Sequence, residues 1–197
     1  MSLKDKKLDD SDILDLEEYI QNRKSIRKEI VNMKKNRRIS LGPYCTFYFE
    51  NFYTMQAQIQ EMLYIEKGGD EQLKDELEAY NPLIPQGKEL VATMMLEIDN
   101  PETRKKILSQ LGSVENQIFI SVNGEKIYAT PEDDIERTDK YGKTSSVHFV
   151  HFYMNKEQIS SFKELSNKIE IGTDHNHYSH LTKIPKEVHE TLINDFD

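Results

Sequence analysis

The stretch ELVATMMLEI, residues 89–98, is apolar on both faces of an extended chain. Leu90 and Met94 fall on one face, and Val91 and Met95 on the other. A strand of this kind is usually covered on both sides by other parts of the protein. We therefore predict that residues 89–98 form an interior strand of a sheet, largely buried on both faces, around which the fold is built.

The other predicted strands show the two-residue alternation of a sheet with one apolar face. Residues 39–49 place Cys45 and the other apolar side chains on odd positions, as one strand or as two strands in register, with a bend at Gly42-Pro43. The dipeptide Asn123-Gly124 predicts a tight hairpin. The remaining predicted strands are residues 117–122, 125–130, 145–154 and 168–173.

Helices are predicted where apolar residues recur at three- and four-residue steps behind a capping residue. The first begins near Ser11 or Asp12, and the others cover residues 54–66, 70–80, 101–112, 155–165 and the chain from about Pro185. About six strands and six helices are intermixed along the sequence. This order favours an α+β fold with an antiparallel or mixed sheet and helices packed on it, a two-layer sandwich. We predict a single domain over residues 1–197, with residues 1–10 as a mobile end.

Composition excludes several classes of protein. The chain has 197 residues, a formal charge of −9 and one cysteine. A single Cys45 forms no disulfide within the chain and excludes metal sites built from two of its cysteines. The most apolar stretch, residues 90–98, is shorter than the roughly 20 residues of a membrane-spanning helix, and the N-terminal residues are too charged for a secretory signal. We expect a cytoplasmic protein without a membrane segment.

Residues 23–38 (RKSIRKEIVNMKKNRR) hold eight basic side chains against one acidic one, Glu29. Such a segment can bind the phosphates of a nucleic acid. It lacks interleaved aromatic residues, and the chain as a whole is acidic. A solvated or ion-paired helix face is therefore the better interpretation, and nucleic-acid binding remains an alternative.

All six histidines follow residue 147. His148 and His151 lie three apart on a predicted strand, so they point to opposite faces and do not share a metal ion. The loop after the strand at 168–173 holds a closer group. Its candidate ligands, with a carboxylate from elsewhere in the chain, make a nitrogen and oxygen set suited to iron, manganese or zinc: Asp174, His175, His177 and His180, with Glu50 or Glu61. The alternative is a polar connection that binds no metal.

Glu50, Gln58 and Glu61 form a second candidate group near the start of a predicted helix. The two carboxylates can act as ligands or as a general base. They can equally form a structural ion pair with Arg37 or Arg38, and we favour that interpretation. Cys45 is expected to be a buried core residue rather than a reactive thiol. The sequence contains no phosphate-binding loop, dinucleotide fingerprint or nucleophile elbow.

Four blocks of the sequence resemble a bacterial family of domains of unknown function over nearly the whole chain. The blocks are RRISLGPYCTFYFEN, QIQEMLYIE, ELEAYNPLIPQGKELVATMMLEID and TDHNHY. The resemblance implies genes placed near those for rubrerythrin-like proteins and iron–sulfur oxidoreductases, and thus a link to redox or peroxide physiology. The positions that match the family motifs are Arg38, Gly42, Glu50, Glu61, Tyr80, Asn81, Glu97, Asp174, His175 and Tyr178.

Taken together, these observations favour a non-catalytic binding or accessory protein in the bacterial cytoplasm, acting on a protein partner or a small ligand. The first alternative is a metal-dependent enzyme or metal carrier that uses the loop at 174–180. The second is a nucleic-acid binder that uses residues 23–38. Whether the protein has enzymatic activity, and whether it is a homo-oligomer, stay open at this point.

Overall fold

The computed structural model describes residues 6–132 and 137–197. Over these residues it contains six α-helices and nine strands in two antiparallel sheets. The first sheet has the order β1 (Arg38–Leu41), β2 (Cys45–Phe49), β3 (Glu89–Leu96), β7 (Val147–Tyr153) and β6 (Thr130–Pro131). The second has the order β5 (Glu125–Tyr128), β4 (Ile118–Val122), β8 (Ile169–Thr173) and β9 (His180–Lys183). The predicted α+β class with antiparallel strands is confirmed.

Strand β3 lies in the middle of the first sheet, between β2 and β7. Met94 on its inner face and Val91 on its outer face are both 0% exposed. The inner face meets the second sheet, and the outer face meets the helices, so both faces are covered. The predicted interior strand is confirmed, and its pairing ends at Leu96.

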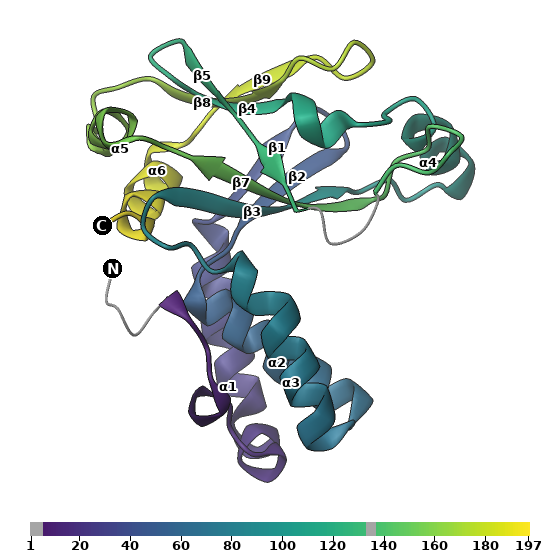
Figure 1. Cartoon of the computed structure of the whole chain (residues 1–197), viewed down its shortest axis with the longest axis vertical. Coiled ribbons are helices and arrows are strands. Elements are labelled where there is room, and N and C mark those ends of the chain that lie inside the picture. The colour runs from purple at the N-terminus through teal and green to yellow at the C-terminus, as the bar shows by residue number, and fades with distance from the viewer. Residues whose placement is uncertain (1–5, 133–136) are drawn as a thin grey trace.

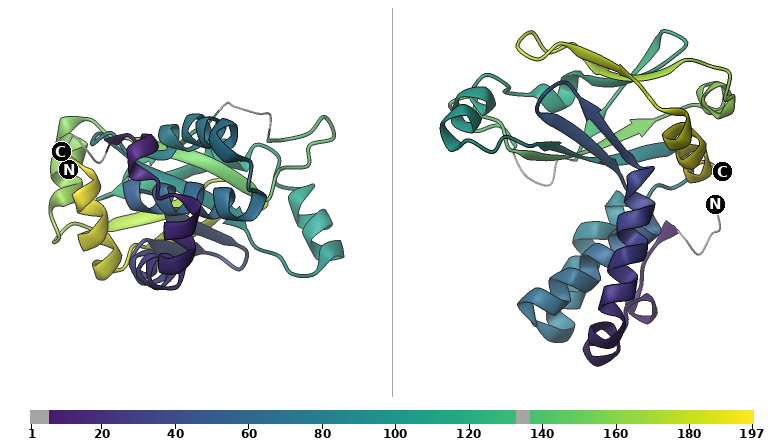
Figure 2. Two further views of the ribbon diagram at one scale, coloured as in Figure 1. Left: turned by 90° about the horizontal axis from the view of Figure 1, so that it is seen from below. Right: turned by 180° about the vertical axis from the view of Figure 1, so that it is seen from behind.

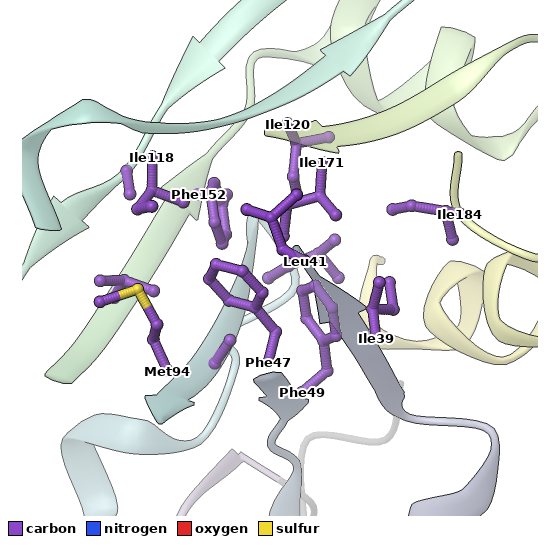
Figure 3. Packing of buried hydrophobic residues seen from close by; sticks show 14 of the residues in the cluster. Ile39, Leu41, Phe47, Phe49, Met94, Ile118, Ile120, Phe152, Ile171 and Ile184 are labelled. Atoms are coloured by element: carbon purple, nitrogen blue, oxygen red, sulfur yellow. The ribbon is translucent and has the colours of Figure 1, made fainter. Parts of the chain in front are cut away.

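The main core lies between the two sheets (Figure 3). Phe47, Phe49 and Phe152 from the first sheet pack against Ile120 and Ile171 from the second. The strands that we predicted as one sheet of about six are thus divided between two sheets that face each other. The apolar face of each strand must pack against another part of the protein. The alternation of apolar residues is the same whether that part is a helix or a second sheet, so it did not reveal the second sheet.

Three helices form an arm that projects from the outer face of the first sheet (Figure 1). They are α1 (Leu16–Lys35), α2 (Phe52–Glu66) and α3 (Gly69–Tyr80), and α2 lies between the other two. A second buried cluster holds the root of the arm, where Met55 and Ile59 of α2 pack with Val91 and Phe149 of the sheet. Figure 2 shows the arm from behind and from below. The remaining helices, α4 (Pro101–Leu108), α5 (Lys156–Lys163) and α6 (Lys186–Leu192), flank the sheets.

The start of the chain differs from its prediction in detail. Asp9 caps a short 3-10 turn at Asp10–Asp12, and Asp15 caps α1, so the helix begins at Leu16. Of the predicted mobile end, residues 1–5 lie outside the described part of the chain. Leu8 is buried in the cluster at the root of the arm, and its backbone N–H donates to Asn81 Oδ1 at 2.7 Å.

The segment at residues 39–49 forms a hairpin of β1 and β2 rather than one strand. Gly42 turns the chain with a φ of +62°, a conformation that favours glycine. A Cβ atom at this position would also lie 2.6 Å from the His180 ring. His180 itself begins β9, a short edge strand in a stretch that we predicted as loop, because four residues carry too little alternation to reveal a strand.

Candidate functional site

A cavity of about 410 Å³ lies in the angle between the helical arm and the outer face of the first sheet. This volume suits a small organic ligand. The sheet, α2, the end of α1 and the end of α3 all contribute to its walls. The lining residues are Lys34, Tyr48, Glu50, Met55, Gln58, Tyr80, Thr93, Met95, Val147 and Phe149.

Glu50 is the buried acid of this cavity. Its side chain is 4% exposed, and its Oε1 accepts a hydrogen bond from Thr93 Oγ1 at 2.7 Å. Its Oε2 is buried and has no hydrogen-bond partner among the described residues. Burial of an ionised carboxylate is unfavourable unless donors or a positive charge compensate it. The free oxygen is therefore suited to a ligand that brings a hydrogen-bond donor or a cation.

Local structure fixes the position of Glu50. The residue follows β2 and precedes Asn51, which caps α2 through a hydrogen bond with the Thr54 N–H. The Glu50 N–H donates to the Val91 carbonyl at 2.8 Å. Its carbonyl accepts from Arg37 Nη2 at 2.9 Å. The backbone of Glu50 is thus held on both sides, which leaves only its side chain free to adapt.

Two tyrosines line the cavity. The Tyr48 hydroxyl donates to Glu97 Oε1 at 3.0 Å, and burial raises the pKa of Tyr48. Burial likewise raises the pKa of Tyr80, against the effect of a hydrogen bond with Gln58. Both hydroxyls are therefore neutral at physiological pH. With Phe149, these rings give the cavity aromatic walls around a single buried acid.

Glu61 does not join this cavity. Its carboxylate receives two hydrogen bonds from Arg23, from Nε and from Nη2, both at 2.9 Å, and a third from the Tyr19 hydroxyl at 2.5 Å. The hydrogen bonds with Arg23 lower the pKa of Glu61 more than burial raises it. The favoured structural ion pair exists at Glu61, but its predicted partners were wrong: Arg37 pairs with Asp195.

The loop at 174–180 distributes its polar side chains among different partners. Asp174 accepts from Lys126 Nζ at 2.8 Å and from the Tyr128 hydroxyl at 2.6 Å. The Nδ1 atom of His175 accepts the backbone N–H of His177 at 3.2 Å. Over residues 6–132 and 137–197, no three His, Cys, Asp or Glu side chains are grouped closely enough to hold a metal ion. Metal binding by this loop stays a prediction.

Tyr178 gives this loop a structural contact that the sequence analysis missed. Its hydroxyl accepts the backbone N–H groups of Tyr44 and Cys45 at 2.9 and 3.0 Å, and donates to the Leu41 carbonyl at 2.7 Å. These hydrogen bonds hold the loop of the second sheet against the β1–β2 turn of the first sheet. The spacing of histidines had drawn attention to this loop, but a buried tyrosine links the sheets there.

His148 and His151 point to opposite faces of β7, as predicted. His148 is opposite Met94, which faces the second sheet, and His151 is opposite Val91, which faces the helices. The Nδ1 atom of His148 lies 3.5 Å from Glu115 Oε2. Burial lowers the pKa of His148, and the Glu115 carboxylate offsets this only in part.

The arrangement of sheets and arm recurs in a known protein. A crystal structure of a protein of unknown function from Burkholderia pseudomallei matches 97% of this chain and 100% of its own, with a TM-score of 0.90 and 35% sequence identity. The model of the family described as "Protein of unknown function (DUF3501)" matches residues 7–196. The chain belongs to the DUF3501 family. A search of curated proteins finds no match.

Two residues that match the family motifs, Glu50 and Tyr80, line the cavity of this DUF3501 chain. No helix within the described residues has the length and apolar character needed to span a bilayer.

In the basic segment, Arg23 and Arg37 form ion pairs within the fold, whereas Lys24, Arg27 and Lys28 are exposed.

Proposed function

We propose that this protein binds a small organic ammonium ion in the cavity between its arm and its first sheet. The observation that carries the proposal is the buried Glu50 Oε2, which lacks a hydrogen-bond partner in a cavity of ligand size. The proposal makes the protein a binding protein, in line with the function favoured by its sequence. The single, buried Cys45 supports a reducing compartment, so we place this binding in the bacterial cytoplasm.

The charge of Glu50 selects the head group of the ligand. An ammonium group at Oε2 would form a charge-assisted hydrogen bond of roughly 2.8 Å, which is stronger than a bond between neutral groups. Thr93 already donates to Oε1, so one new donor completes the hydrogen bonding of the carboxylate. A neutral ligand would supply a weaker bond, and an anion would be repelled.

The walls of the cavity select the body of the ligand. Met55, Met95 and Phe149 offer apolar contact. The rings of Tyr48 and Tyr80 favour a cation through their negative faces. An apolar or aromatic body attached to a protonated amine therefore fits both features of the cavity.

Three probes of similar shape test this proposal: phenethylamine, 2-phenylethanol and 3-phenylpropionate. Isothermal titration at neutral pH should show the strongest binding for phenethylamine and weaker binding for the other two probes. Glu50→Gln keeps the shape of the side chain and removes its charge, and it should weaken phenethylamine binding by about tenfold or more.

Glu102→Gln is the matched control, because Glu102 is exposed in the first turn of α4 and does not line the cavity. This variant should bind phenethylamine as the wild type does. The proposal is wrong if phenethylamine does not bind, or if it binds equally well to wild type and Glu50→Gln.

A further inference from the structure

Lys34 lines the same cavity as Glu50. From this arrangement we infer that the cavity selects zwitterions, with Lys34 binding an anionic group of the same molecule whose ammonium group meets Glu50. This inference rests on the proposed function and names the chemical class of its ligand.

Lys34 differs from Arg23, the other half-buried cation of α1. The Lys34 side chain is half-buried in the last turn of α1. Among the described residues, no carboxylate lies within 4.0 Å of its Nζ atom. Arg23, also half-buried on α1, is paired with Glu61 at 2.9 Å. The positive charge of Lys34 is therefore not neutralised by a carboxylate, and the lysine lines a cavity large enough for a small ligand.

Lys34 and Glu50 share the cavity without touching. No ion pair joins them, because the Lys34 Nζ atom and the Glu50 carboxylate oxygens lie more than 4.0 Å apart. Lys34 and Gln58 also line a smaller pocket between α1 and α2. Lys34 therefore lies at the side of the cavity that is next to the contact between these two helices. A zwitterion with its ammonium group at Glu50 and its anionic group at Lys34 would neutralise both charges at once.

A purely structural role for Lys34 is the competing explanation. Cations in the last turn of a helix are stabilised by the helix dipole, and Lys35 occupies the same turn. A dipole interaction acts on the stability of α1 and does not change the affinity for a carboxylate. Ligand selectivity therefore separates the two explanations.

The test compares phenethylamine with two zwitterions that add a carboxylate to it. In L-phenylalanine the carboxylate lies beside the amine, and in 4-(2-aminoethyl)benzoate it lies at the far end of the ring. At least one of them should bind wild-type protein about tenfold more tightly than phenethylamine. Lys34→Met should abolish this gain, and it should not weaken the binding of phenethylamine, because it removes a positive charge that repels the ammonium group. Lys35→Met, an exposed neighbour, should keep the gain.

The outcomes separate this inference from the proposed function. If phenethylamine binds and neither zwitterion binds more tightly, or if the gain survives in Lys34→Met, the zwitterion inference is wrong and the ammonium site stands. If phenethylamine fails to bind the wild type, the proposed function is wrong, and the zwitterion inference is wrong with it.

Discussion

Arg37 and Asp195 form a buried ion pair between two segments that are 158 residues apart in sequence. Their side chains are 3% and 5% exposed. Arg37 also donates to the carbonyls of Phe49 and Glu50 at 2.8 and 2.9 Å. One guanidinium group therefore joins the end of the chain to the junction of β2 and α2, where the acid of the cavity lies.

Removal of this guanidinium group should destabilise the fold strongly. Arg37→Met leaves Asp195 buried without its cation and leaves two carbonyls without donors. Loss of one partner of a buried pair typically costs about 3–5 kcal/mol of unfolding free energy. Urea denaturation measures this quantity, and Arg38→Met, on the exposed neighbour, is the control. A loss below about 1 kcal/mol for Arg37→Met would contradict the structural role of the pair.

The interior position of β3 gives a second prediction. Met94 is fully buried between the sheets, whereas its neighbour Met95 is half-buried at the cavity. Met94→Ala should therefore cost about 2–5 kcal/mol of unfolding free energy, and Met95→Ala clearly less. Met94→Asp should prevent stable folding, because it places a charge in the core. Equal losses for the two alanine variants would show that β3 is not covered as described.

His148 should make the stability depend on pH. Burial holds the pKa of its folded-state imidazole below the ordinary value of about 6.5. Below about pH 6.5 the unfolded chain therefore binds more protons at this residue than the folded chain, and stability falls as the pH decreases. The slope contributed by one histidine is at most about 1.4 kcal/mol per pH unit.

Urea denaturation between pH 5 and 7.5 tests this dependence. His148→Gln should flatten the loss of stability toward low pH, and it leaves in place the two charged groups that face this residue, Glu115 and Arg137. His177→Gln, at an exposed position, should leave the slope unchanged. If the wild type and His148→Gln lose stability in parallel, the burial of a neutral His148 is not the cause.

Tyr178 and Cys45 give the fourth prediction. The Tyr178 hydroxyl fastens the turn beside Cys45, and burial raises the pKa of the Cys45 thiol. The native protein should therefore react with a disulfide reagent such as Ellman's reagent only as it unfolds. Tyr178→Phe should cost about 1–3 kcal/mol, because it leaves buried backbone groups without a partner, and should speed the reaction. Rapid labelling of the native wild type would refute the burial of Cys45.

Local sequence patterns determined much of this fold. The two apolar faces of residues 89–98 required cover on both sides, and Asn123-Gly124 required the hairpin of β4 and β5. The alternation of a strand also placed His148 and His151 on opposite faces and Cys45 in the core. Each of these properties depends on residues close together in sequence, whose side-chain directions follow from the backbone period alone.

Only the tertiary structure decided which strands share a sheet and which acid lies in the cavity. Glu50 and Glu61 were equivalent candidates in the sequence, yet Arg23 pairs with Glu61, while Glu50 keeps one oxygen without a partner. Likewise, the pairing of Arg37 with Asp195 and the contact of Tyr178 with the β1–β2 turn join distant segments. Such contacts depend on how the arm and the two sheets pack in space. A periodic pattern of side chains along the sequence does not predict that packing.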